Sequence, residues 1–197
     1  MTADRPEIRD AKATGRAFDE LLVMLVQAGD RAAGERLARR WHPRLLRMAR
    51  RLLQDEDAAL SAVQESWVAI CRGLPSLRDP AAFPAWAFSI VRRRSADRIR
   101  QFQTSRARDG GNAAEMPLAA RDERTEERLG LLQAFKTLPE GQRLAAHLHY
   151  VEGLSLREIA LVADIPEGTA KSRLFHARQS LKRALDHHEG ETDDTDR

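Results

Sequence analysis

The apolar residues of the chain recur at intervals of three and four positions, which is the spacing that buries one face of a helix. The first run of this kind ends at Gly29-Asp30 and contains Phe18, Leu21, Leu22 and Leu25. No segment alternates apolar and polar residues over the length of a strand. The pattern therefore predicts an all-α protein. Its core should be mostly aliphatic, since aromatic residues make up only 5% of the sequence.

Two further helices are expected in the next forty or so residues. The first covers about residues 31–54, and its apolar stripe is Leu37, Trp41, Leu45, Met48 and Leu52. Pro43 lies inside this run and favours a kink or a break, because proline cannot donate a helical hydrogen bond. The second is expected to begin at Asp55-Glu56-Asp57, where carboxylates meet the positive end of a helix. Its stripe is Leu60, Val63, Trp67 and Ile70.

A loop with two prolines, residues 73–80, precedes a fourth helix that should begin near Ala81. The apolar face of this helix is Phe83, Trp86, Ala87 and Ile90. After Val91 the same face continues through the polar residues Arg94, Asp97 and Gln101. The helix is therefore expected to leave the core and to project a basic end. A solvated surface helix is the alternative, and the abrupt change of character favours a binding role.

Composition divides the chain into two small helical domains. Residues 104–124 are rich in Ser, Arg, Gly, Asn and Ala and contain the helix-breaking run Asp109-Gly110-Gly111-Asn112, which predicts a flexible linker. The first domain then covers residues 17–103. The second covers residues 125–186, where helical spacing resumes at Leu129, Leu132 and Phe135. An acidic tail, residues 187–197, follows the second domain.

The second domain carries the pattern of a helix-turn-helix between about Ser155 and Leu185. Ser155 and Glu158 have the spacing of a capping box, which begins a helix with the apolar face Leu156, Ile159 and Ala160. Ala163-Asp164-Ile165 is expected to form the turn, because aspartate tolerates turn conformations. Pro166 suits the first position of the helix that follows.

This last helix is expected to bury Ala170, Leu174, Ala177 and Leu181. Its opposite side then presents Thr169, Ser172, Phe175, His176 and Gln179, with Lys171, Arg173 and Arg178 on the flanks. Central groups that reach base edges and flanking cations that reach phosphates are what a major-groove helix needs. An ordinary amphipathic helix pair is the alternative, but it gives no reason for an exposed Phe175.

Charge and composition narrow the function further. The net charge is +3, and basic residues gather in two stretches, Arg92 to Arg108 and Lys171 to Arg183, which indicates a polyanionic partner such as nucleic acid.

Cys71 is the only cysteine, so an intramolecular disulfide and a cysteine zinc site are excluded. The histidines form no metal set with carboxylates, and we expect neither metal nor cofactor. The absence of a signal peptide and of an apolar span predicts a cytoplasmic protein without membrane insertion.

Three segments together resemble one known family. The first is LPEGQRLAAHLHYVEGLSLREIALVADIPEGTAKSRLFHAR, residues 138–178, which is similar to region 4 of bacterial sigma-70 factors. The others are VQESWVAI, residues 63–70, and FPAWAFSIVRRRSADRIR, residues 83–100, which are similar to region 2. The resemblance covers about residues 18–186 and leaves no room for a region 3 domain. It is therefore closest to the extracytoplasmic-function (ECF) sigma factors.

The resemblance implies a non-enzymatic subunit that binds the β′ and β subunits of core RNA polymerase and reads promoter DNA. It also implies control by an anti-sigma factor. The residues implied to bind polymerase are Asp57, Gln64, Glu65 and Trp67. Those implied to handle the melted −10 element are Leu77, Arg78, Trp86, Arg93, Asp97, Arg98 and Arg100. Those implied to read the −35 duplex are Thr169, Lys171, Ser172, Arg173, Phe175, His176 and Arg178.

The chain departs from the family pattern at three places. Ser61 stands where the family usually has an aspartate, and Arg93 stands where it usually has an asparagine. Phe175-His176 replaces a His-Arg pair in the recognition helix, which predicts a −35 preference different from that of its relatives. Two other functions stay open: a sigma-like decoy that sequesters an anti-sigma factor, and a stand-alone repressor that uses only the helix-turn-helix.

Overall fold

The computed structural model describes residues 6–109 and 133–192, and every described element is helical. The chain divides into two compact units, Met1–Ala119 and Ala120–Arg197. The all-α, two-unit prediction is therefore confirmed. Leu129, Leu132 and most of the predicted linker lie outside the described residues.

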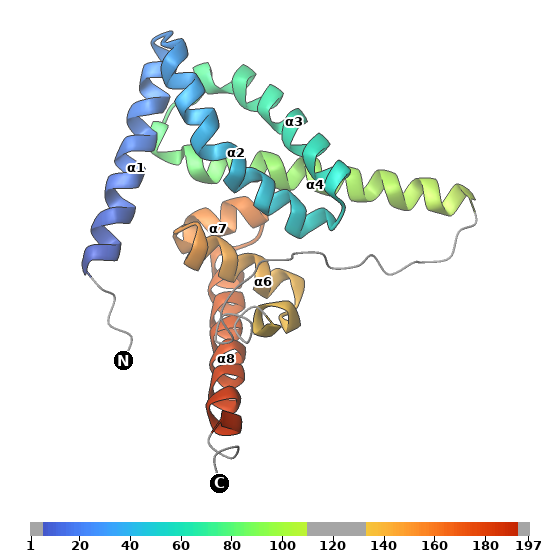
Figure 1. Ribbon diagram of the computed structural model, residues 1–197. Helices are drawn as coiled ribbons and strands as arrows, with labels where there is room; N and C mark the ends of the chain where they lie inside the picture. The colour runs from blue at the N-terminus through green and yellow to red at the C-terminus, as the bar shows by residue number, and fades with distance from the viewer. Residues whose placement is uncertain (1–5, 110–132, 193–197) are drawn as a thin grey trace. The chain divides into compact units, whose positions relative to one another are not determined.

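The first unit is a bundle of four long helices (Figure 1), and its elements are α1 (Pro6–Gln27), α2 (Arg31–Leu53), α3 (Glu56–Gly73), the 3₁₀ turns η1 (Leu74–Ser76) and η2 (Pro80–Ala82), and α4 (Phe83–Asp109). Helices α2, α3 and α4 contact one another in every pairing, and α1 packs mainly on α2. The side chains of Asp30 and Asp55 cap the starts of α2 and α3, by accepting hydrogen bonds from the Ala33 and Ala58 amides. The predicted start of α3 at residues 55–57 is thereby confirmed.

The core of this unit centres on an aromatic cluster. Trp41 is fully buried and meets the ring of Phe83 edge-on at 5.0 Å and the ring of Phe88 at 5.5 Å, between ring centroids. Leu37, Leu45 and Met48 are buried with it, as their spacing predicts. Leu52 is only half-buried, and its neighbour Leu53 takes the core position.

Helix α2 runs from Arg31 to Leu53 with Pro43 inside it, so of the two predicted alternatives, a kink or a break, the break is wrong. An internal proline costs a helix about 3 kcal/mol. The buried side chains on either side, Trp41 and Leu45, contribute more than that to the core, because burial of a Trp and a Leu stabilises by several kcal/mol.

Two predicted stripes need correction. Phe18 and Leu21 are 45% and 47% exposed, whereas Leu22 of the predicted stripe is buried together with Asp19 and Val23. Leu60 on α3 is also exposed, whereas Val63 and Ile70 of its predicted stripe are buried together with the small residues Ala59, Ala62 and Ser66. In both helices only part of the predicted stripe is buried, and small or polar neighbours complete the buried face.

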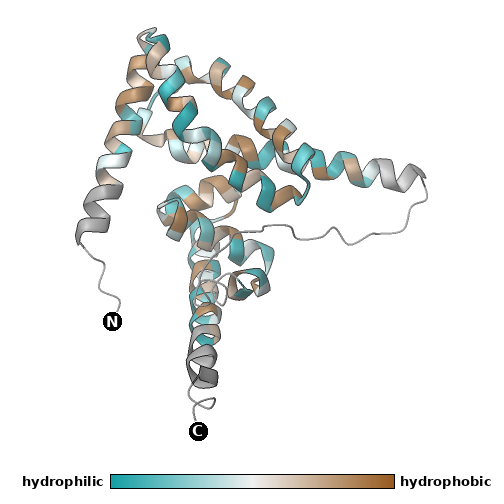
Figure 2. Ribbon diagram, viewed as in Figure 1, coloured by the Kyte–Doolittle hydropathy of each residue, from teal (hydrophilic) through white to brown (hydrophobic). Residues whose placement is uncertain are grey.

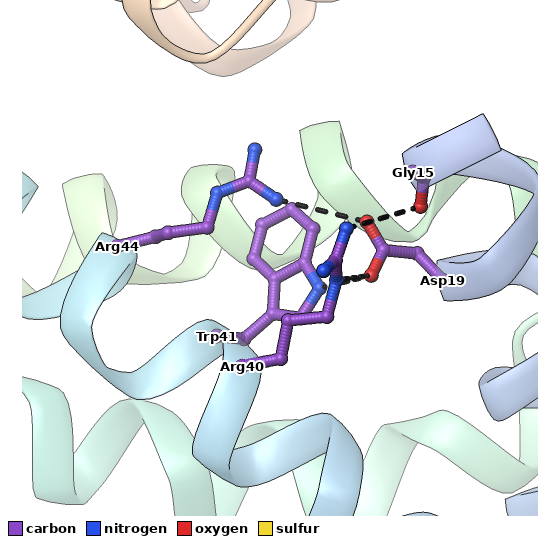
Figure 3. A network of polar contacts seen from close by, with 5 residues as sticks. All are labelled: Gly15, Asp19, Arg40, Trp41 and Arg44. Carbon is purple, nitrogen blue, oxygen red and sulfur yellow. Dashed lines mark hydrogen bonds and ion pairs between the residues drawn. The ribbon is translucent and has the colours of Figure 1, made fainter. Parts of the chain in front are cut away.

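The burial of Asp19 has a clear cause (Figure 3). Its carboxylate accepts hydrogen bonds from Trp41 Nε1 at 3.0 Å and from Arg40 Nε at 2.5 Å, and Arg44 lies 3.6 Å away. The Arg44 guanidinium also lies over the Trp41 ring, 3.8 Å from its centroid. The network ties α1 to α2, and it determines which face of α1 turns inward.

The end of α4 extends beyond the other helices of the first unit (Figure 1), and residues 92–104 of this helix are mostly polar or charged (Figure 2). The prediction of a helix that leaves the core is thus confirmed. The helix ends at Asp109, where the helix-breaking run begins. Residues 104–109, which composition assigned to the linker, are therefore helical.

The second unit contains a short helix at 133–137, α6 (Glu140–Ala146), a π-helical turn η3 (His147–Val151), α7 (Leu156–Ala163) and α8 (Glu167–Thr192). Its core includes Ala134, Leu138 and Ala146 together with Ala177 and Leu181 of α8. Phe135 packs against this cluster, so its assignment to an apolar face is confirmed. Helix α8 continues into the acidic tail, as far as Thr192.

Residues five apart share a side of a π-helical turn, and η3 uses this to bury a polar pair. His147 Nε2 lies 3.5 Å from the Glu152 carboxylate, and both side chains are 2% exposed. The turn ends at Gly153, whose φ of 74° suits a residue without a side chain. The chain then continues into α7.

Candidate DNA and polymerase interfaces

The helix-turn-helix of the second unit has the local geometry that the sequence predicts. Ser155 Oγ accepts from the Glu158 amide, and the Glu158 carboxylate accepts from the Ser155 amide, which completes a capping box at the start of α7. Asp164 forms the turn in the left-handed region at φ 51°. Pro166 precedes α8 rather than beginning it, and its carbonyl accepts from the amides of Thr169 and Ala170.

Helix α8 separates its faces as predicted. Ala170, Leu174, Ala177 and Leu181 are buried, while Ser172, Phe175, His176 and Gln179 are exposed. Thr169 is half-buried. Phe175 is 55% exposed, and its ring meets that of His176 edge-on at 5.5 Å. An aromatic pair of this kind on a solvent-facing helix can contact thymine methyl groups and base edges.

The three cations flanking this face have different surroundings. Lys171 is exposed. Arg173 is half-buried and lies over Gly141 of α6, where an added Cβ would be 2.9 Å from the Arg173 Cζ atom. Arg178 is exposed, and its Nε donates a hydrogen bond to the Tyr150 hydroxyl at 3.0 Å. Sequence reasoning missed Gly141 and Tyr150, because each meets its arginine across about thirty residues.

On α4 the predicted −10 residues lie on the extended basic end. Arg93 and Arg100 are exposed, while Asp97 and Arg98 are half-buried. Arg100 forms an ion pair with Asp97 one turn away, and Arg98 forms an ion pair with Glu65 of α3. The structure thus joins two residues, Glu65 and Arg98, that the sequence assigned to different partners.

The predicted polymerase residues share α3. Asp57, Gln64 and Glu65 are exposed, and Ser61 beside them is half-buried. Trp67 is half-buried, and its Nε1 donates to His42 Nδ1 of α2 at 3.2 Å. Three of the four side chains are therefore accessible to a protein partner.

The turn between α3 and α4 carries two further predicted −10 residues, Leu77 and Arg78. The side-chain amide of Gln27 donates to the carbonyls of Leu74 at 2.9 Å and Leu77 at 2.8 Å, so α1 holds this turn in place. Arg78 is exposed and Leu77 is half-buried.

Trp86 is also half-buried, and its ring lies so close to Gly73 that a Cβ there would be 2.8 Å away. It also meets Phe83, with 6.2 Å between ring centroids. Much of its surface is thus occupied within the first unit.

The described residues contain no group of three or more His, Cys, Asp or Glu side chains arranged to hold a metal ion. None of their helices is long and apolar enough to cross a membrane.

Comparison with known proteins agrees with this geometry. Residues 37–105 match Sigma-70 region 2, and residues 128–181 match Sigma-70, region 4. The ECF RNA polymerase sigma-E factor of Salmonella typhimurium is 30% identical over 176 residues, which cover 83% of this chain and 92% of that protein. SigM of Mycobacterium tuberculosis, also an ECF RNA polymerase sigma factor, is 34% identical over 171 residues, 86% of this chain and 85% of SigM.

Solved structures share the fold. The sigma factor RpoE of Bartonella quintana superposes with a TM-score of 0.63 at 22% identity, covering 83% of this chain and 98% of RpoE. CnrH superposes with a TM-score of 0.57 at 24% identity and is covered to 98%. With both regions matched in order and relatives matched over most of their length, the chain belongs to the sigma-70 family, as an ECF sigma factor.

Proposed function

We propose how this ECF sigma factor divides promoter recognition between its two units. Residues 17–103, continued by the end of α4, would dock on the polymerase clamp and melt and read the −10 element. Residues 125–186 would read the −35 element as duplex, joined to the first domain by the linker. In this role the chain is a regulatory subunit of the cytoplasmic polymerase with no catalytic residue of its own.

The observation that carries the −35 assignment is the exposed face of α8. Four of its side chains, Ser172, Phe175, His176 and Gln179, face solvent directly opposite the buried stripe. Lys171 and Arg178 border this face and can reach phosphates. A helix that only packed in a bundle would not need an exposed aromatic pair between cations.

For the first unit the proposal rests on accessibility. Asp57, Gln64 and Glu65 are exposed on one helix, as a docking surface for the β′ clamp requires. Arg93 and Arg100 are exposed on the projecting end of α4, with Arg98 and Asp97 beside them. Cations along a backbone path suit a single strand, which is held mainly through its phosphates and by stacking.

We also propose control by an anti-sigma factor. The RpoE structure that shares this fold was solved with the anti-sigma factor NepR, and CnrH was solved with the cytosolic domain of CnrY. An anti-sigma partner would act by covering the polymerase or DNA surfaces described above.

The test is transcription by core RNA polymerase reconstituted with the purified chain, on duplexes randomised at the −35 and −10 positions. We expect the holoenzyme to select a defined promoter that core polymerase alone does not use. No selective initiation, together with tight binding of an anti-sigma domain, would make the chain a decoy. Specific DNA binding without polymerase would instead support a stand-alone repressor.

Variants of the recognition helix test the −35 assignment. Lys171→Ala and Arg173→Ala should each weaken use of the selected promoter, and each should lower the slope of log affinity against log salt by about 0.9. Lys136→Ala removes one exposed charge of the same unit from a residue outside the recognition helix and should change neither. Normal promoter use and an unchanged slope in both α8 variants would place the −35 reader elsewhere.

A further inference from the structure

The hydrogen bond between Tyr150 and Arg178 connects two elements that are 28 residues apart in the sequence. The donor is the Nε–H of Arg178, and the acceptor is the hydroxyl oxygen of Tyr150, at 3.0 Å. A guanidinium has five N–H donors in one plane, and this bond occupies the one nearest the stem. The four N–H groups of the two terminal nitrogens are therefore the donors that can reach a phosphate or a base.

Tyr150 is itself held by its neighbours in and after the π-helical turn η3. Its ring meets the His149 ring edge-on, with 4.9 Å between centroids. His149 Nδ1 lies 2.9 Å from the carbonyl oxygen of Leu154. Because a carbonyl only accepts, Nδ1 carries the hydrogen and the orientation of the imidazole is defined. The tyrosine ring thus contacts a side chain that is itself hydrogen-bonded to the backbone.

The anchor of this arrangement is the segment that begins the helix-turn-helix. Leu154 is 1% exposed, and its amide donates to the Leu148 carbonyl at 2.9 Å. The next residue, Ser155, caps α7. The contacts therefore run from the backbone at the start of α7, through His149 and Tyr150, to Arg178 on α8.

Arg178 stands beside the exposed face of α8. It follows Phe175 by three positions, which places the two side chains about 60° apart around the helix axis. Both are exposed. A guanidinium fixed by its Nε in this position presents its terminal edge next to the aromatic pair.

We propose that Tyr150 is a positioning residue for the −35 contact, holding Arg178 so that its terminal N–H groups meet the DNA backbone. This inference rests on the proposed function of α8. Tyr150 belongs to neither helix of the helix-turn-helix, and its hydroxyl acts through the arginine. An arginine that is already oriented loses less side-chain freedom when it binds, so the tyrosine raises affinity for the −35 duplex.

The expected size follows from the cost of immobilising one long side chain on binding. Loss of the hydroxyl in Tyr150→Phe should weaken −35 binding by about threefold to tenfold. The phenylalanine ring still packs on His149, so the fold is retained, and circular dichroism with thermal unfolding verifies this. In an Arg178→Ala background the same change should have an effect of less than about twofold, because nothing is left to position.

The bond can be tested in the full chain without polymerase, because Tyr150 is the only tyrosine. Labelling tyrosine with ¹³C at Cζ gives one resonance, whose shift reports the hydrogen bond at the hydroxyl. Arg178→Ala should move this resonance, whereas Arg157→Ala, which removes an exposed charge on α7, should not. An unmoved resonance in Arg178→Ala would overturn the proposal.

Binding is then measured with the reconstituted holoenzyme and the duplex that it selects, for the wild type, the two single variants and the double variant. Equal losses from Tyr150→Phe in both backgrounds, or no loss in either, would overturn the positioning role. If Arg178→Ala binds normally, the arginine does not contact DNA and the inference falls with it. If Arg178→Ala loses affinity but Tyr150→Phe does not, only the inference fails and the −35 assignment of α8 stands.

Discussion

Two predicted −10 arginines of the first unit pair with carboxylates, whereas two predicted −35 arginines of the second unit lie against uncharged groups. On α4, Arg98 pairs with Glu65 and Arg100 pairs with Asp97. On α8, Arg178 bonds to a tyrosine hydroxyl and Arg173 lies over a glycine. Under the proposed assignments, Arg98 and Arg100 would exchange a carboxylate for a phosphate, whereas Arg173 and Arg178 would keep their uncharged partners when DNA binds.

The buried carboxylates of the two units differ in how far along the sequence their partners lie. Asp19 of the first unit is bonded to residues 21 and 22 positions away, and it joins α1 to α2. Glu152 of the second unit faces His147 within a single turn. The first carboxylate therefore holds tertiary structure and the second holds local structure.

The largest expected effect is that of Asp19→Ala. It leaves the buried Trp41 N–H without its acceptor and removes the anion between two arginines, which we expect to destabilise the first unit by about 3 kcal/mol. Arg40 is partly exposed and can turn to water, which keeps the loss below that of a fully buried pair. Urea unfolding followed by tryptophan fluorescence measures it, since all three tryptophans lie in this unit.

The control for this prediction is Glu35→Ala. Glu35 is 74% exposed and pairs with Arg39 on the same helix, so its loss should cost less than about 0.5 kcal/mol. Asp19→Asn retains an oxygen that can accept from Trp41 and should fall between the two. Equal stability of Asp19→Ala and Glu35→Ala would mean that the network does not hold α1 on α2.

A smaller loss is expected from Glu152→Ala, about 1–3 kcal/mol, confined to the second unit. The substitution removes the carboxylate that lies 3.5 Å from the buried His147 Nε2, and the expected size is that of one lost buried polar contact. Glu152→Gln, which keeps an acceptor, should lose less. The labelled Tyr150 resonance follows unfolding of this unit. If Glu152→Ala proved as costly as Asp19→Ala, the contrast between the two carboxylates would be wrong.

These two carboxylates also mark where sequence reasoning ends. The burial of Leu37, Trp41, Leu45 and Met48 could be predicted, because the spacing of apolar residues within one helix identifies the face that packs in the core. The burial of Asp19 could not, because it depends on side chains of another helix. On α1 the buried face includes Asp19, whereas Phe18 and Leu21 of the predicted stripe are exposed.

In the candidate site too, local features could be predicted from the sequence and contacts between elements could not. The capping box and the two faces of α8 follow from spacings of three and four residues, and both are present in the structure. The partners of Arg173 and Arg178 come from α6 and η3, and no local pattern indicates them. The same holds for the pairing of Glu65 with Arg98, which joins separate motifs.

Gly141→Ala should have opposite effects on stability and on binding. A helical glycine replaced by alanine gains stability, here about 0.5 kcal/mol because position 141 lies in the first turn of α6. The new Cβ would overlap the Arg173 guanidinium, which must then move. We expect the second unit to become slightly more stable while −35 binding by the holoenzyme falls by about twofold to threefold.

Gly168→Ala is the matched control for this variant, because an added Cβ there meets nothing within 4 Å. It should leave Arg173 in place. A Gly141→Ala protein that binds the −35 duplex as the wild type does would show that Arg173 needs no support from α6. The contrast between supported arginines in the second unit and paired arginines in the first would then rest on Arg178 alone.

The smallest expected effect concerns an ion pair on the surface of the first unit, whose two side chains are 49% and 55% exposed. Arg50 of α2 donates from Nε and Nη2 to the two carboxylate oxygens of Glu56 at 2.8 and 2.5 Å. These hydrogen bonds lower the pKa of Glu56 from its ordinary value of 4.5. Because the folded-state pKa is depressed, the contribution of the pair is complete above 4.5 and is lost as pH falls through the folded pKa.

The difference in free energy of unfolding between wild type and Glu56→Gln should therefore be small and constant near neutral pH, and should vanish in acid. Added salt should shrink it as well, because exposed charges are screened. Tryptophan fluorescence in urea, repeated at decreasing pH, measures the difference. A difference that grew in acid would mean that protonated Glu56 is the stabilising form, and that charge pairing does not hold this junction of α2 and α3.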